Sequence, residues 1–90
     1  MNEKRQITVS QMQPGQSGTV VQIVGGHGYH RGRGHSHGLV DRLHSLGIRP
    51  GKRLTKVSGM FMRGPVTLQV GRAQVAIGFG MARRIVVEVD

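Results

Sequence analysis

Glycine and proline interrupt this chain at short intervals, and this spacing limits it to short strands and at most a brief helix. Six segments rich in β-branched residues lie between the interruptions: 7–9, 19–24, 53–58, 66–70, 73–77 and 85–89. Apolar and polar residues alternate along several of them, as expected for strands with one buried face. Five to six such strands in 90 residues predict a mainly β fold. We expect a closed or nearly closed small barrel, because closure removes exposed strand edges.

One short α-helix is predicted among these strands, over about residues 39–46. Three leucines recur there at i, i+4 and i+7: Leu39, Leu43 and Leu46. This spacing places them on one face of a helix, and we expect that face to join the core. Gly47 suits the left-handed position that ends helices, and Pro50 follows closely enough to prevent continuation.

The composition sets the character of the core and of the surface. The length indicates a single domain over 1–90, with 1–6 as an expected flexible tail. Aromatic residues make up 3% of the chain, so the core must be aliphatic. Thirteen basic and four acidic residues give a net charge of +9. Such a surface attracts anionic partners, which include nucleic acid, acidic proteins and acidic membrane faces.

Several classes of protein are disfavoured by what the sequence lacks. It contains no cysteine, which excludes disulfides and thiolate metal sites. No apolar run approaches the roughly 20 residues that span a bilayer, so we expect a cytoplasmic protein that does not cross a membrane. It has neither a phosphate-cradling P-loop nor a Ser/His/Asp set at a recognised spacing, and we therefore expect no enzymatic activity.

The histidines are the candidate metal ligands of the chain. Four lie in a glycine-rich loop predicted over 25–38 and the fifth on the predicted helix: His27, His30, His35, His37 and His44. Imidazole binds Zn, Ni and Fe, and an all-imidazole site should prefer Zn or Ni to Fe(II). The alternative is a solvated loop without metal. Ordering its six glycines would cost roughly 1–2 kcal/mol of backbone entropy each, and two nearby arginines would repel a cation.

A second candidate region is the apolar tip between the strands predicted at 53–58 and 66–70. It is formed by Met60, Phe61 and Met62. Methionine and phenylalanine adapt to apolar grooves, so this tip is either a cap over the barrel end or an exposed anchor for a partner.

A set of motifs spans the chain from residue 7 to residue 89. They are Val9-x2-Met12-x-Pro14-Gly15, Gly25-Gly26, Arg42-Leu43-x2-Leu46-Gly47-Ile48-x-Pro50-Gly51, Gly64-Pro65-Val66, Gly71 before Val75-Ala76-Ile77, and Met81-Ala82 before Ile85-Val86-Val87. In these motifs the chain resembles the ferrous-iron transport protein A (FeoA) family, whose members have an SH3-like β-barrel. Two features depart from the family pattern. They are the extra histidines and Ile77-Gly78-Phe79-Gly80, which stands where a Leu-Arg type of sequence is usual.

The resemblance implies an accessory or regulatory protein of ferrous-iron uptake. Its expected partner is the membrane ferrous-iron transporter GTPase, of the ferrous-iron transport protein B type, contacted on its cytoplasmic part. Our hypothesis for the contact comprises Arg42 and the tip 60–62, and we also allow for weak self-association. The alternative is a stand-alone barrel that binds a transition metal or nucleic acid. Nucleic acid is disfavoured, because only Tyr29, Phe61 and Phe79 could stack on bases.

Overall fold

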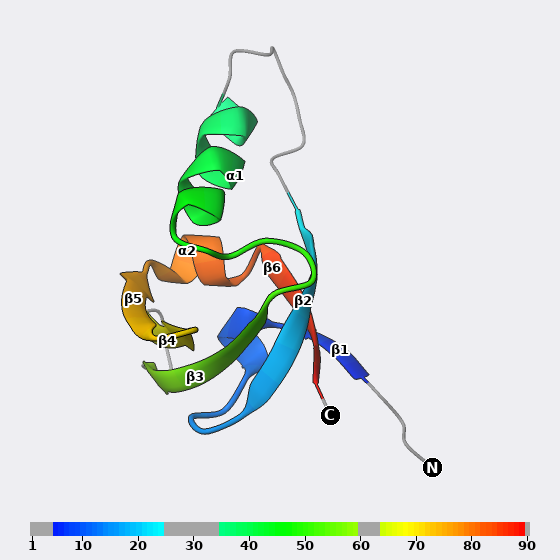
Figure 1. The fold of residues 1–90 in the computed structure, drawn as a ribbon, viewed down its shortest axis with the longest axis vertical. Coiled ribbons are helices and arrows are strands. Elements are labelled where there is room, and N and C mark those ends of the chain that lie inside the picture. Colours follow the sequence, from blue (N-terminus) through cyan, green and yellow to red (C-terminus); the bar gives the residue numbers. More distant parts are fainter. Residues whose placement is uncertain (1–4, 25–34, 60–63, 90) are drawn as a thin grey trace.

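A six-stranded antiparallel sheet curls around an aliphatic core, with a helix standing on one end of it (Figure 1). The computed structural model describes residues 5–24, 35–59 and 64–89. In chain order the elements are β1 (Arg5–Thr8), the 3₁₀ turn η1 (Val9–Gln11), β2 (Ser17–Ile23), α1 (His35–Ser45), β3 (Arg53–Gly59), β4 (Val66–Val70), β5 (Ala73–Ile77), α2 (Phe79–Ala82) and β6 (Ile85–Val89).

The strands lie side by side in the order β1-β6-β2-β3-β4-β5. Register shifts fall between Val20 and Gln22 in β2 and between Lys56 and Ser58 in β3. Such bulges bend a strand and increase its twist, which helps the sheet to curl. β1 and β5 form the two ends of the order and are not hydrogen-bonded to each other in the part of the chain described, so the barrel keeps an open seam.

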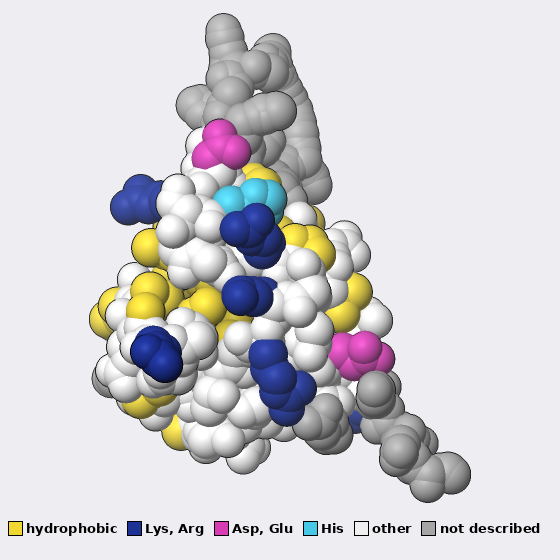
Figure 2. Space-filling model, in the orientation of Figure 1, with side chains coloured by type: hydrophobic (Ala, Val, Ile, Leu, Met, Phe, Trp, Pro, Cys, Tyr) yellow, Lys and Arg dark blue, Asp and Glu magenta, His cyan; other side chains and the backbone are white. Residues whose placement is uncertain are grey.

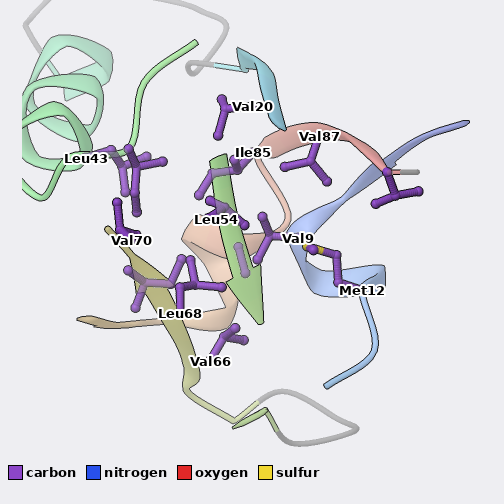
Figure 3. Packing of buried hydrophobic residues seen from close by; sticks show 14 residues of the cluster. Val9, Met12, Val20, Leu43, Leu54, Val66, Leu68, Val70, Ile85 and Val87 are labelled. Atoms are coloured by element: carbon purple, nitrogen blue, oxygen red, sulfur yellow. The ribbon is translucent and has the colours of Figure 1, made fainter. Parts of the chain in front are cut away.

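The core fills the space inside the curled sheet. Alternate residues of β4 and of β6 are buried, as a period of two requires. Figure 3 shows the buried side chains converging between the strands. The buried apolar residues come from η1, α1, α2, the strands β2 to β6 and the segments that follow η1 and α1. They are Val9, Met12, Val20, Leu43, Ile48, Leu54, Val66, Leu68, Val70, Ile77, Ala82, Ile85, Val87 and Val89. The core is therefore aliphatic, as the composition requires.

The predicted fold class is confirmed: the domain is mainly β, has six strands and is barrel-like. The last three strands have the predicted bounds, 66–70, 73–77 and 85–89. A four-residue helix, α2, follows β5 and leads into β6.

The first strand begins earlier than the sequence predicted. β1 begins at Arg5, within the segment that we expected to be a tail, and Arg5 pairs with Val89. Pairing uses only backbone groups, so an exposed charged residue can occupy an edge strand.

The predicted helix bounds were also wrong at the N-terminal end. α1 begins at His35, four residues before the predicted start, and ends at Ser45. Residues 35–38, which we assigned to the loop, therefore belong to the helix. Gly38 lies within it and costs only about 1 kcal/mol relative to alanine. That cost is too small to end a helix whose later turns are fixed by the complete burial of Leu43.

Candidate interaction surface

The C-terminal end of α1 is closed by a Schellman motif. The N–H of Ile48 donates to the carbonyl of Leu43 at 2.9 Å, and the N–H of Gly47 donates to that of His44 at 3.0 Å. Gly47 has a φ of 91°, the left-handed conformation that this motif requires at that position. Leu43 and Ile48 are both fully buried, which supplies the apolar contact of the motif. The direction in which the chain leaves the helix is therefore fixed.

A tight turn follows at once and carries basic residues at both ends. The N–H of Lys52 donates to the carbonyl of Arg49 at 3.0 Å, with Pro50 and Gly51 at the central positions. Gly51 has a φ of 94°, as a type II turn requires at its third residue. Two backbone hydrogen bonds join the turn to β2. The N–H of Gly51 donates to the carbonyl of Val20 at 2.8 Å, and the N–H of Val20 donates to the carbonyl of Lys52 at 2.9 Å.

We name Arg49, Lys52 and Arg53 the basic turn. All three residues are exposed. Figure 2 shows Lys and Arg side chains one below another on this face of the molecule, from the level of the end of α1 downward. The segment 46–53 contains no carboxylate, and Arg42 and His44 add further basic groups in the last turn of α1. Basic groups at that end are favoured by the helix dipole. The result is a cationic surface held on a fixed backbone.

Acidic residues are few near this surface. Among the described residues the acidic side chains are Asp41, exposed on α1, and Glu88, half-buried on β6. Thr19 lies between Arg53 and Glu88 in the sheet register, and the Arg53 Nη1 lies 3.5 Å from the Thr19 hydroxyl. The Arg53 side chain therefore lies across the neighbouring strand β2. The basic turn as a whole keeps an excess of positive charge.

A buried cation was missed by the sequence analysis. Lys56 is only 4% exposed, and its Nζ donates to the carbonyl of Met12 at 2.7 Å. Burial lowers the pKa of the Lys56 ammonium below its ordinary value, because desolvation disfavours the charged form. The signal was present in the sequence: counting by two from the buried Leu54 places Lys56 on the inner face. Its contact joins β3 to the segment after η1, which is a structural role.

The five candidate metal ligands lie only partly within the described residues. His27 and His30 lie outside the described residues, and the backbones of His35 and His37 belong to the first turn of α1. His44 is half-buried in the last turn. Within the described ranges 5–24, 35–59 and 64–89, no group of three or more metal-binding side chains is found. The metal site therefore stays a prediction of the sequence.

Of the predicted partner contacts, only Arg42 lies within the described residues. Arg42 is exposed next to the end of α1. The tip 60–62 lies outside the described residues, so its two interpretations stay open. No helix in the described part of the chain is long and apolar enough to cross a membrane.

The curled six-stranded sheet, with α1 between β2 and β3, has an SH3-like architecture. The FeoA domain matches residues 7–89, and the chain belongs to the FeoA family. An iron uptake regulatory protein (FeoA) of known crystal structure is 31% identical, with a TM-score of 0.79, covering 96% of this chain and 100% of that one. The family is associated with ferrous-iron transport.

Two further solved structures share the fold. FeoA from Stenotrophomonas maltophilia, a prokaryotic SH3 domain protein solved in complex with zinc, is 26% identical with a TM-score of 0.72 over 90% of this chain and 88% of that one. A manganese-dependent transcriptional repressor is 19% identical with a TM-score of 0.76, and the match covers all of this chain and 45% of the repressor. At that identity the likeness concerns the fold alone. Among curated protein sequences, none matches this chain.

Proposed function

We propose that this chain is a non-enzymatic accessory protein of ferrous-iron transport, which acts in the cytoplasm by docking on the cytoplasmic part of the membrane ferrous-iron transporter GTPase. Membership of the FeoA family supports the transport role. The observation that favours docking is the basic turn, in which three exposed cations are held on a backbone hydrogen-bonded to β2. A fixed cationic surface is suited to an acidic protein face, because complementary charge raises the rate of encounter and selects the partner.

The test compares two charge reversals of equal size. The variant Arg49→Glu/Lys52→Glu reverses two of the three charges of the basic turn. The control Arg5→Glu/Arg72→Glu reverses two exposed arginines, one on β1 and one in the β4–β5 turn. Both change the net charge by the same amount. Binding to the purified transporter in detergent is measured by calorimetry at low and moderate salt.

We expect the basic-turn variant to bind at least about tenfold more weakly and to lose most of the salt dependence, while the control stays within about threefold of the wild type. Equal weakening of both variants would mean that only the overall charge matters. If neither variant weakened binding, docking through the basic turn would be refuted. Circular dichroism must first show that both variants are folded.

A second candidate function is transition-metal binding by the five histidines. What supports it is their number in the sequence and the zinc complex of the Stenotrophomonas maltophilia relative. An imidazole site would hold a divalent ion through neutral ring nitrogens and would lose it as these protonate in mild acid.

A further inference from the structure

The two edge strands of the sheet differ in how they are protected. Proteins block unwanted strand pairing at an edge with charged residues or proline. β1 begins with the exposed Arg5, which follows Glu3 and Lys4 in the sequence. β5 has the sequence AQVAI and contains neither a charge nor a proline. Figure 1 places it at the outer edge of the sheet, on the side away from β1.

Among the described residues, the backbone groups of β5 that β4 does not use belong to two residues. Gly71 and Arg72 form a two-residue turn between β4 and β5, and Val70 pairs with Ala73 across it. In such a hairpin the closing pair exchanges backbone bonds and every second pair repeats this pattern. The backbones of Ala73, Val75 and Ile77 therefore face β4, and those of Gln74 and Ala76 face away. Gln69 and Gln74 form the pair between two such hydrogen-bonded pairs, and their side chains meet there, with Nε2 of Gln74 donating to Oε1 of Gln69 at 3.2 Å.

We propose that β5 is a self-association edge, which pairs antiparallel with β5 of a second copy of this chain about a two-fold axis at Val75. Gln74 of each copy then lies opposite Ala76 of the other, and each of these pairs exchanges two backbone hydrogen bonds. All the outward groups of these two residues are satisfied in this single register. The two sheets become one continuous sheet.

The side chains of β5 are compatible with this pairing. Val75 is half-buried and packs against the core of its own copy. In the register about Val75 the two valines form the close type of antiparallel pair, with Cα atoms about 4.5 Å apart, so both lose exposed apolar surface. The exposed Gln74 meets the small Ala76 without a clash, and Arg72 falls opposite Gly78 of the second copy. No like charges face each other.

The dimer should be weak and favoured by salt. Its interface is one five-residue strand, far below the roughly 800 Å² per partner of a stable complex. Each copy also carries a net charge of +9, so the two repel each other at long range. Added salt screens this repulsion, since the Debye length falls from about 30 Å at 0.01 M to about 10 Å at 0.1 M. Salt should therefore strengthen self-association and weaken the proposed docking on an acidic partner, which separates the two proposals.

The absence of cysteine from the chain allows a direct test of the register. In the variant Val75→Cys the two thiols would lie at the two-fold axis, within the range of Cα separations that disulfides accept. The control Val57→Cys places a thiol on β3, where the valine is 39% exposed but not at an edge. Under mild oxidation we expect the Val75 variant to form a covalent dimer and the control to form little.

Sedimentation equilibrium of the wild type supplies the second measurement. We expect a monomer–dimer equilibrium between about 10 μM and 1 mM that strengthens from 0.05 to 0.5 M salt. Ala76→Pro, which removes an outward N–H that β4 does not use, and Ala76→Lys, which charges the edge, should both weaken it at unchanged circular dichroism. A wild type that stays monomeric throughout, equal crosslinking of the two cysteine variants, or dimers unaffected by both Ala76 substitutions would overturn the proposal.

Discussion

Replacing Gly47 with alanine should lower the free energy of unfolding by about 2 kcal/mol. An L-residue in the left-handed conformation costs about 1–2 kcal/mol, and Gly47 has a φ of 91°. An added Cβ would also lie 3.2 Å from Cγ1 of Val70, which is buried and can move only slightly. Tight contacts of this kind cost less than the 1–3 kcal/mol of a full extra methylene, so about 0.5–1 kcal/mol is reasonable.

Two further substitutions separate the backbone contribution from the contact. Gly51 has nearly the same φ, 94°, and an added Cβ there meets nothing within 4 Å. Gly51→Ala should therefore lose only the backbone part, about 1–1.5 kcal/mol. Gly47→Asn keeps the contact with Val70 but tolerates the left-handed conformation, so it should be less damaging than Gly47→Ala.

Urea unfolding followed by circular dichroism measures these differences. For a domain of this size, 2 kcal/mol corresponds to a fall of roughly 8–16 °C in Tm. If Gly47→Ala were as stable as Gly51→Ala, the contact with Val70 would carry no energy. If neither substitution lowered stability, the left-handed conformations themselves would be refuted.

The remaining predictions concern a buried charge and the histidines. The pKa of Lys56 is lowered by burial, so the unfolded chain binds its proton more tightly than the folded chain. The penalty is fully present below the folded pKa and is relieved as the pH rises towards the ordinary value of 10.5. The unfolding free energy of the wild type should therefore rise relative to that of Lys56→Met between neutral pH and 10.5, and a flat or falling difference would contradict this reasoning. In anaerobic calorimetric titrations the chain should bind Zn(II) more tightly than Fe(II), with loss of binding in His27→Ala/His30→Ala. Tighter Fe(II) than Zn(II) binding would disprove an all-imidazole site.

The sequence predicted best where a short alternating segment is bounded by residues that stop a strand. β4, β5 and β6 have the predicted bounds because glycine or proline, or the short α2 turn, lies at their ends. The end of α1 was predictable from Gly47 and Pro50. Its beginning was not, because His35 to Gly38 carries no apolar periodicity and a weak helix former does not forbid a helix that tertiary contacts stabilise.

The candidate surface was predictable only in its charge. A net charge of +9 indicated a cationic protein, but Arg49, Lys52 and Arg53 are adjacent in the sequence to apolar and turn residues and form no obvious basic run. They form one surface because two turns and the bonds to β2 fix the backbone between them. Lys56 was assigned no role for the opposite reason, since a lysine in a strand is normally expected to face solvent.

The two backbone bonds between Val20 and the 51–52 segment also affect how this domain can vary. These bonds join the two ends of the long connection between β2 and β3, which contains α1. Beyond them, residues 17–19 of β2 pair with residues 53–55 of β3. The entropy of closing a loop grows only slowly with its length, by about 0.6 kcal/mol per doubling. Insertions between the end of β2 and the start of α1 should therefore be tolerated without loss of the sheet, whereas the buried Leu43 and Ile48 restrict changes in the segment that follows. A histidine-rich segment could have been acquired there at little thermodynamic cost, and the same position offers a place to graft a peptide tag or a sensor.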